Sequence, residues 1–285
     1  MNFTDKIKLA KPGIAVLLDL VAVTTFLLGL KNISLLWKVF PLLISGTMAS
    51  FASSLANNYF DRDIDGKMER TKWRASFKGG IYLPLSVISL LAFSLVISMV
   101  FLNLFTTIWI LGGFLSYSFL YTVALKRRTS WNIVIGGIAG SFPALAGWSS
   151  VNTPISPVSI FVAAMVFLWT PTHFWTLAMK YKDDYRKVGI PMLPSIREEK
   201  FVVNVILVNT VVLVAFSFLP VFLRIQFPVL YYILLIPASI YLLARVTFLL
   251  LPRGNRAARS FKAFLASNYY LSIFLAILIL TTLRF

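Results

Sequence analysis

The 285-residue chain contains no cysteine, a single histidine and only ten acidic residues. The absence of cysteine excludes disulfides, thiolate metal sites and cysteine nucleophiles. Charged residues make up 13% of the chain, whereas hydrophobic residues make up 59%, and the mean hydropathy is +0.83. Ordinary soluble domains are far less apolar than this. The composition therefore predicts a protein that crosses a membrane several times.

Nine apolar segments are long enough to cross a bilayer as helices, which takes about 20 residues each. They are 12–30, 37–58, 81–102, 105–124, 131–150, 157–179, 202–223, 228–250 and 264–283. We expect one all-α membrane domain over residues 1–285. Its pattern resembles two four-helix halves (12–124 and 131–250), each with an acidic loop after its second helix, followed by a ninth helix.

The formal net charge of +17 would indicate a nucleic-acid partner in a soluble protein. Here the bases sort by membrane side, as the positive-inside rule describes. If the N-terminus is inside, nearly all of the 27 Lys and Arg residues fall in cytoplasmic segments; the exceptions are Lys31, Lys38, Arg224 and Arg284. We therefore expect a lipid bilayer and no nucleic acid. The N-terminus shows no cleavable signal or transit peptide, which favours a prokaryotic cell membrane.

The most informative stretch runs from Asn57 to Arg74, directly after the second apolar segment. Asn57, Asp61 and Asp65 are spaced by four residues, so a continuous helix would place them on one face, with a rise of about 6 Å along the helix axis from each to the next. Their amide and carboxylate oxygens suit Mg²⁺, which prefers a few carboxylates together with substrate phosphates. The spacing predicts a metal–diphosphate site at the end of a membrane helix.

Basic residues near this stretch are candidates for diphosphate binding, because their charged donors form strong hydrogen bonds with phosphate oxygens. They are Arg62, Lys67, Arg70 and Arg74, with Lys126 and Arg127 after the fourth span and Lys182 after the sixth. Charged loops that end membrane helices are, however, usually just solvated, and bases after the fourth span also fit a purely topological role.

A second acidic loop follows the sixth span and contains Asp183, Asp184, Glu198 and Glu199. It lies four spans after the first acidic loop, so both loops face the same side of the membrane. Two carboxylate clusters on one face are able to clamp a polyanionic group through metal ions. The alternative is two independent, solvated loops.

Two further ionisable side chains fall within predicted spans. Asp19 is an acid in the first span, and intramembrane carboxylates normally face a cavity or the interior of the bundle. It is also close enough to the inner end to reach water. His173, between aromatic residues in the sixth span, is the only histidine. A lone histidine usually packs in the core, but a neutral imidazole also ligates iron or acts as a base.

These motifs resemble a known family. The sequence N-x-x-x-D-R-D-I-D over Asn57–Asp65, followed by Met68-Glu69-Arg70-Thr71, is similar to the first aspartate-rich motif of the UbiA-type intramembrane prenyltransferases. Other segments narrow the resemblance to the protohaem IX farnesyltransferases, or haem O synthases. These are Tyr121-Thr122 with Leu125-Lys126-Arg127, Asn132–Gly137, Trp169–Trp175, and Asp184-Tyr185 leading to Gly189–Pro194. The resemblance extends from about Lys11 to the C-terminus.

The resemblance implies a nine-helix fold with an active site that opens to the cytoplasm under the two acidic loops. The implied reaction joins the farnesyl group of farnesyl diphosphate to a vinyl group of haem B with addition of water, giving haem O and diphosphate. Haem O then leads to the haem A of terminal oxidases. Mg²⁺ is the implied cofactor, and haem A synthase or oxidase-assembly proteins are candidate protein contacts.

The resemblance also assigns roles to residues. The implied catalytic set is Asn57, Asp61, Asp65, Asp184 and His173, and the implied metal ligands are Asn57, Asp61, Asp65, Asp183 and Asp184. His173 would contact the haem, as axial ligand in preference to a base that activates water. The second loop departs from the family pattern, because Lys187 and Val188 stand four residues after Asp183 and Asp184, where many relatives have an aspartate. Fewer carboxylates, or a single Mg²⁺, are therefore expected there.

Two alternatives remain at this stage. In the first, the enzyme belongs to the same family but its acceptor is an aromatic compound, a quinone precursor or a lipid instead of haem. His173 discriminates between these acceptors and haem, because they hold no iron for a histidine to ligate. The prenyl chain, farnesyl or geranylgeranyl, is not fixed by the sequence. A transporter would place its ionisable residues near the membrane midplane, whereas nearly all the acids here lie at one face. That distribution favours an enzyme.

Overall fold

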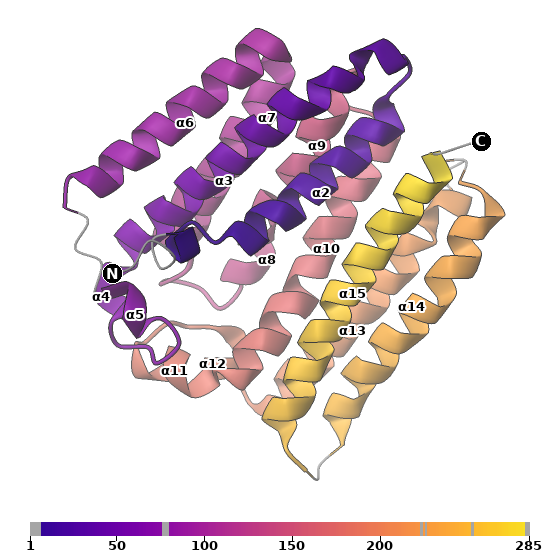
Figure 1. Ribbon diagram of the computed structural model, residues 1–285. Helices are drawn as coiled ribbons and strands as arrows, with labels where there is room; N and C mark the ends of the chain where they lie inside the picture. The colour runs from indigo at the N-terminus through magenta and orange to yellow at the C-terminus, as the bar shows by residue number, and fades with distance from the viewer. Residues whose placement is uncertain (1–6, 76–79, 223–224, 226, 252–253, 283–285) are drawn as a thin grey trace.

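The computed structural model describes residues 7–75, 80–222, 225, 227–251 and 254–282 (Figure 1). Over these residues the chain is all-helical, as predicted, and contains no strand. Five residues of the charge pattern, Lys6, Lys78, Arg224, Arg253 and Arg284, lie outside the described residues, as do the predicted span ends at 223 and 283.

Eight helices in the described part of the chain are long and apolar enough to cross a membrane. They are built from α2 (Pro12–Gly29), η1 with α3 (Ile33–Lys38 and Val39–Phe60), α6 (Tyr82–Phe101), α7 with η2 (Leu104–Leu115 and Ser116–Leu125), α10 (Pro157–Lys180), α13 with η4 (Glu199–Ser217 and Leu219–Val221), α14 with η5 (Val229–Thr247 and Phe248–Leu250) and α15 (Arg256–Thr282). These correspond to eight of the nine predicted spans.

The remaining predicted span, 131–150, is an interrupted helix. It consists of α8 (Asn132–Gly136), a 3₁₀ segment η3 (Gly137–Ser141) and α9 (Phe142–Ser149). Pro143 stands in the first turn of α9, where its missing N–H leaves no intrahelical hydrogen bond unmade. A Cβ at Gly147 would lie 1.9 Å from the carbonyl oxygen of Ala22, so this glycine is what lets α9 pack directly against α2. The count of nine spans stays a prediction.

The second half of the fourth long helix is wound as a π-helix, η2. The hydroxyl of Thr122 donates to the carbonyl oxygen of Tyr117 at 2.9 Å, five residues earlier. The rings of Tyr117 and Tyr121 stack with their centroids 5.7 Å apart. Wide helical turns of this kind frequently occur at functional sites. Here the π-helix directs two tyrosines toward the interior of the bundle.

Helix contacts within the bundle combine small polar residues with apolar packing. Ser94 on α6 donates to the carbonyl oxygen of Ser45 on α3 at 2.7 Å, an interaction typical of membrane helix interfaces. The outer faces of the helices are apolar: Tyr82, Phe93 and Val100 on α6 are each more than half exposed. A bilayer is the solvent that such a surface requires.

Both acidic loops form short helices at the same end of the bundle, while the C-terminus lies at the other end (Figure 1). The first loop contains α4 (Arg62–Asp65) and α5 (Lys72–Ala75), and the second contains α11 (Lys182–Lys187) and α12 (Leu193–Ile196). Residues of both loops line one open hollow at this end. The predicted juxtaposition of the two loops is therefore present.

Candidate active site

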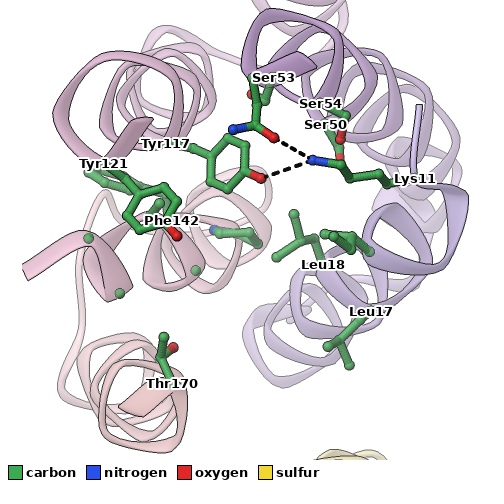
Figure 2. Close-up of a pocket in the computed structure, with 18 of the residues that line it drawn as sticks. Lys11, Leu17, Leu18, Ser50, Ser53, Ser54, Tyr117, Tyr121, Phe142 and Thr170 are labelled. Atoms are coloured by element: carbon green, nitrogen blue, oxygen red, sulfur yellow. Dashed lines mark hydrogen bonds between the residues drawn. The ribbon is translucent and has the colours of Figure 1, made fainter. Parts of the chain in front are cut away.

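A cavity of about 350 Å³ lies inside the bundle, below the two loops. Its polar end is lined by Lys11, Asn57, Asp65, Arg70, Arg74, Lys126 and Tyr185. The rest of its wall is mostly apolar or aromatic and comes from α2, α3, the π-helix, the interrupted helix, α10 and α15; Figure 2 shows part of this wall, including Leu18, Tyr117, Tyr121 and Phe142. One space therefore connects a charged end with an apolar interior.

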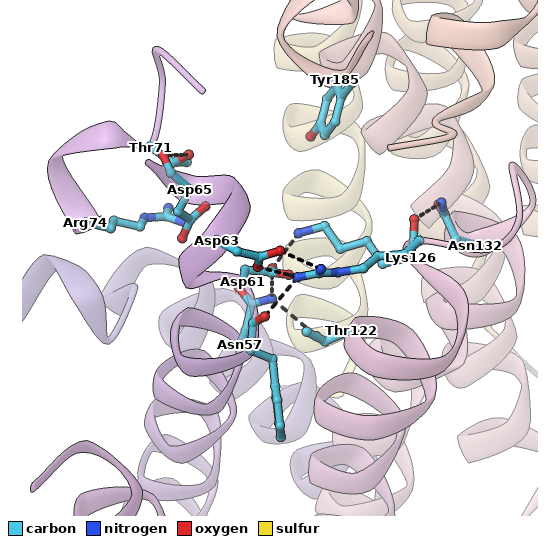
Figure 3. A network of polar contacts seen from close by, with 12 residues as sticks. Asn57, Asp61, Asp63, Asp65, Thr71, Arg74, Thr122, Lys126, Asn132 and Tyr185 are labelled. Carbon is cyan, nitrogen blue, oxygen red and sulfur yellow. Dashed lines mark hydrogen bonds and ion pairs between the residues drawn. The ribbon is translucent and has the colours of Figure 1, made fainter. Parts of the chain in front are cut away.

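The predicted oxygen face is present at the polar end (Figure 3). Although α3 ends at Phe60, the backbone N–H of Asp61 still donates to the carbonyl oxygen of Asn57 at 2.9 Å. The backbone N–H of Asp65 donates to the carbonyl oxygen of Asp61 at 2.8 Å. The helical path thus continues through all three residues. Asn57, Asp61 and Asp65 are 4%, 1% and 4% exposed. These side chains are buried, so a solvated loop does not describe them.

Two carboxylate oxygens at this face have no hydrogen-bond partner among the described residues: Oδ1 of Asp61 and Oδ2 of Asp65. The other oxygen of Asp61, Oδ2, accepts from Asn57 Nδ2 at 2.7 Å and from Lys126 Nζ at 2.5 Å. The nearest cations stand at ion-pair distance: Arg127 Nη2 is 3.8 Å from Asp61 Oδ1, and Arg74 Nη1 is 3.6 Å from Asp65 Oδ2. A buried carboxylate oxygen that accepts no hydrogen bond is costly, and a divalent cation with its phosphate ligands would satisfy both. The residues present therefore fit Mg²⁺.

Three of the predicted diphosphate-binding bases line the cavity, namely Arg70, Arg74 and Lys126. Arg74 Nη1 lies 3.6 Å from Asp65 Oδ2, and Arg70 Nη2 donates to the hydroxyl of Tyr185 at 3.2 Å. The structure does not bring the other four predicted bases to the cavity. Arg62 lies over the exposed ring of Tyr59, and Lys67 is exposed. Arg127 makes a bidentate pair with the exposed Asp63. Lys182 pairs with Glu199.

Sequence reasoning missed Lys11 as a site residue and assigned it only to the topology pattern. Its ammonium is buried at the polar end, where it donates to Oδ1 of Asn57 at 2.6 Å and to the hydroxyl of Tyr117 at 3.4 Å (Figure 2). Burial lowers the pKa of Lys11 to about 7. Oδ1 of Asn57, the atom that would ligate a metal, is therefore held by Lys11 in this structure.

The backbone of Lys11 explains how its side chain reaches the cavity. Its φ is +54°, and among the described non-glycine residues it alone has a positive φ. The left-handed conformation costs free energy, and the following Pro12 restricts the backbone of Lys11 further. Strain of this kind concentrates at functional sites. The Lys-Pro pair at the start of the first span was the available signal, but a sequence alone does not reveal the sign of φ.

The second acidic loop contributes Tyr185, not its aspartates, to the main cavity. Asp183 is exposed and pairs with Arg186 at 3.3 Å. Asp183 and half-buried Asp184 line the hollow between the two loops, together with Glu69, Arg70, Lys180 and Tyr181. Arg70 lines both spaces. Within the described residues, no three acidic or histidine side chains are grouped so as to hold a metal, so the predicted five-ligand set is not assembled as one cluster.

Both intramembrane ionisable residues line the cavity. Asp19 lies on α2, and its Oδ2 accepts a hydrogen bond from Thr47 on α3 at 2.6 Å. His173 lies on α10, half buried, and its Nδ1 is 3.1 Å from the hydroxyl of Ser267 on α15. Of the two alternatives that the sequence left open for Asp19, the structure places it at the cavity wall, and its role stays open.

A helical membrane bundle with a carboxylate- and base-lined end above an apolar cavity is the architecture expected of an intramembrane prenyl-transfer enzyme. The model of the UbiA prenyltransferase family matches residues 19–268, and the chain belongs to this family. It is accordingly a prenyltransferase.

Within this family, the chain is similar to curated proteins named protohaem IX farnesyltransferases. One of them, protohaem IX farnesyltransferase 2 of Picrophilus torridus, is 44% identical over 230 residues, 79% of each chain. The protohaem IX farnesyltransferase of Sulfurisphaera tokodaii is 36% identical over 286 residues, which cover 98% of this chain and 93% of the relative.

Solved structures share the fold at low sequence identity. A digeranylgeranylglyceryl phosphate synthase superposes with a TM-score of 0.76 at 19% identity and covers 98% of both chains. A UbiA homologue from Archaeoglobus fulgidus, bound to GPP and Mg²⁺, superposes with a TM-score of 0.66 at 14% identity, over 95% of this chain and 98% of that one. The all-α membrane fold predicted from the sequence is confirmed.

Proposed function

We propose that the chain transfers the farnesyl group of farnesyl diphosphate to a vinyl group of haem B, with addition of water, to give haem O and diphosphate. The observation that carries the proposal is that one cavity joins Asn57 and Asp65, which share a buried helical path with Asp61, to an apolar interior lined by the only histidine. The names of the relatives support haem as the acceptor. The product would serve haem A and terminal-oxidase biogenesis.

The polar end holds the diphosphate in this proposal. Asn57, Asp61 and Asp65 would hold Mg²⁺, as the two aspartate oxygens that accept no hydrogen bond suggest. The ion would neutralise charge on the leaving diphosphate. Asp184, and with it Asp183, would join only after the second loop closes over the cavity. Arg70, Arg74 and Lys126 supply the surrounding positive charge. Preorganised charge of this kind is usually the largest single catalytic contribution.

Lys11 adds a further cation to this set. In the structure its ammonium is hydrogen-bonded to Asn57 Oδ1. When the diphosphate enters, that ammonium transfers its hydrogen bond to a phosphate oxygen and frees the amide oxygen of Asn57. Arg127, whose Nη2 lies 3.8 Å from Asp61 Oδ1, supports that carboxylate directly. Arg62, Lys67 and Lys182 act at longer range, through the potential at the mouth of the site.

The apolar interior protects the reacting carbon. As the C1–O bond of farnesyl diphosphate breaks, its electron pair leaves with the diphosphate and positive charge develops on C1. The terminal vinyl carbon of haem B then bonds to C1, and water adds to the inner vinyl carbon with loss of a proton. The rings of Tyr117, Tyr121 and Phe142 line this space; aromatic faces stabilise cations, and apolar walls keep water away until the vinyl group attacks.

The haem lies against α10 and α15 in this proposal, with His173 as its axial ligand. The polar end of the cavity and both acidic loops lie at the bundle end where the basic residues collect, which by the positive-inside rule is the cytoplasmic side. The enzyme therefore works from the cytoplasmic face of a prokaryotic plasma membrane. Haem A synthase or oxidase-assembly proteins are the candidate recipients of the product.

The test is extraction and mass analysis of haems after expression in a host that lacks its own haem O synthase. We expect haem O with the native chain and none with Asp61→Asn, whereas Asp63→Asn, which changes an exposed aspartate two residues away, retains the product. A haem with a longer prenyl group would revise the donor alone. Unmodified haem from a folded, membrane-inserted native chain would refute the proposal and favour an aromatic, quinone-precursor or lipid acceptor.

A further inference from the structure

The imidazole of His173 is held between two aromatic rings. Its centroid lies 4.2 Å from the ring of Trp169, at an interplanar angle of 27°, and 4.6 Å from the ring of Phe264, at 38°. Two rings this close to one imidazole must cover opposite faces, because they would overlap on the same face. The ring plane is thereby fixed, and His173 meets the cavity through its edge.

The hydrogen bonds of Ser267 determine which ring nitrogen carries the proton. The hydroxyl of Ser267 donates to the carbonyl oxygen of Phe264 at 2.7 Å. A hydroxyl has a single hydrogen, so toward His173 the same oxygen acts as acceptor, and Nδ1, 3.1 Å away, is the donor. A neutral imidazole carries one N–H. The network therefore assigns the proton to Nδ1 and leaves a lone pair on Nε2.

Ser267 is itself firmly placed. It is completely buried, and its carbonyl oxygen accepts a hydrogen bond from Nε1 of Trp169 at 2.7 Å. Trp169 thus both stacks on the imidazole and anchors the residue that orients it. In the described residues no hydrogen bond engages Nε2, while the His173 side chain lines the cavity. The free lone pair is the remaining polar feature of the ring.

We propose that Ser267 is a positioning residue, which holds His173 in the tautomer whose Nε2 ligates the iron of haem B during prenyl transfer. This inference rests on the proposed function and deepens it. Metal-ligating histidines almost always donate their other N–H to an acceptor, which fixes the ring and raises its basicity. Iron ligation would hold the porphyrin on α10 and α15 and so restrict which vinyl group can approach the polar end.

The test is haem binding by the purified full-length chain in detergent, with haem B as the probe. Resonance Raman spectra of the ferrous complex report the iron–histidine stretch, whose frequency depends on the hydrogen bond at Nδ1. Absorption titration gives the Kd. We expect a His173-dependent stretch in the native chain, absent in His173→Ala. In Ser267→Ala we expect the stretch at lower frequency and a Kd raised about 10-fold.

Two further variants separate this role from a general loss of stability. Ser267→Thr keeps the hydroxyl and should restore the native frequency. Ser260→Ala removes another fully buried serine of α15, whose hydroxyl bonds only within its own helix, and should leave the spectrum unchanged. An iron–His173 band of the same frequency in the native chain and in Ser267→Ala would overturn the inference.

The outcome also distinguishes this inference from the proposed function. If the native chain forms haem O but shows no His173-dependent band, the ligand assignment is wrong and the transferase function stands. If the chain neither binds nor modifies haem B, both are wrong.

Discussion

Lys126 and Asp61 form an ion pair at 2.5 Å that joins the end of the second long helix to the end of the fourth. Their side chains are only 13% and 2% exposed. Next to them, Arg127 and Asp63 form a second pair, at 2.6 Å, whose side chains are 40% and 59% exposed. The two pairs are adjacent in sequence and differ strongly in burial, and Arg127 connects them because its Nη2 also lies 3.8 Å from Asp61 Oδ1.

Replacing one partner of the buried pair should cost far more stability than replacing one partner of the exposed pair. Lys126→Met leaves the buried carboxylate of Asp61 without its hydrogen-bonded cation and with only Arg127, whose Nη2 lies 3.8 Å from Asp61 Oδ1; breaking a buried pair costs up to about 3–5 kcal/mol. Asp63→Asn breaks an exposed pair, for which about 1 kcal/mol or less is expected. Thermal unfolding of the detergent-solubilised variants measures the difference.

The double variant Asp61→Asn/Lys126→Met should recover much of the lost stability, because no unpaired charge remains, and yet form no haem O. Equal unfolding temperatures for Lys126→Met and Asp63→Asn would show that the buried pair is not formed in the folded protein.

Activity should depend on Asp65 much more than on Asp183. Asp65 is buried at the cavity with a carboxylate oxygen that accepts no hydrogen bond from the described residues, whereas Asp183 is exposed and paired with Arg186. We expect Asp65→Asn to lower kcat by about 100-fold or more, the usual scale for losing a preorganised electrostatic group. We expect Asp183→Asn to lower it by about 10-fold or less. Initial rates of haem O formation at saturating substrate and known enzyme concentration measure both, and equal losses would place Asp183 among the essential metal ligands.

The pH dependence of stability should reveal the buried amine of Lys11. Burial lowers its pKa from 10.5 to about 7 in the folded protein. Between these two values the unfolded chain binds the proton and the folded chain does not, so stability rises with pH across this window. Below pH 7 the amine is charged in both states and its burial remains unfavourable.

Lys11→Met removes this titration. We therefore expect the melting temperature of the native protein to rise, relative to Lys11→Met, as the pH increases from 6 to 9. Lys31→Met changes an exposed lysine between the first two long helices. Its melting temperature should change with pH in parallel with that of the native protein. If the melting temperatures of Lys11→Met and of the native protein also change in parallel with pH, the Lys11 side chain is solvated.

Close packing between α2 and α9 makes Gly147 sensitive to a single methyl group. A Cβ at Gly147 would lie 1.9 Å from the carbonyl oxygen of Ala22, a backbone atom, so the two helices must separate. Overpacking of this kind costs about 1–3 kcal/mol or more. Gly147→Ala should therefore lower the melting temperature and the yield of folded protein.

Gly13→Ala is the matched control, because a Cβ at this α2 position would meet nothing within 4 Å. It should leave the melting temperature unchanged or slightly higher, since alanine restricts the unfolded chain. A native-like melting temperature for Gly147→Ala would show that α9 does not contact α2 at this point.

The parts of the site that sequence could predict are those set by local periodicity. Asn57, Asp61 and Asp65 follow one helical path, and a spacing of four residues suffices to place them on one face. The contact of Lys11 with Asn57 spans 46 positions and depends on a left-handed residue, which no periodicity encodes. The pairing of His173 with Ser267 likewise depends on how α10 and α15 meet.

The bases illustrate the same limit. Arg62 and Arg74 belong to one stretch and carry the same charge, yet Arg74 lines the cavity and Arg62 lies over Tyr59. Their directions are set by the turns between α3, α4 and α5. Composition and span length predicted the all-α membrane fold because both follow from the bilayer itself. They did not predict the 3₁₀ break at Gly137–Ser141 or the π-helix before Lys126.

The interrupted helix at 132–149 has a consequence for how the protein is assembled during synthesis. Its glycines, its two serines and its 3₁₀ turn leave it poorly suited to partition into lipid alone, because polar backbone that is not fully hydrogen-bonded is tolerated at membrane depth only against other protein. The segment packs on α2 and on α10, and α10 emerges from the ribosome after it. Residues 132–149 must therefore wait at the insertion machinery until α10 is made, so that this wall of the cavity enters the membrane together with α10, as a hairpin of two helices.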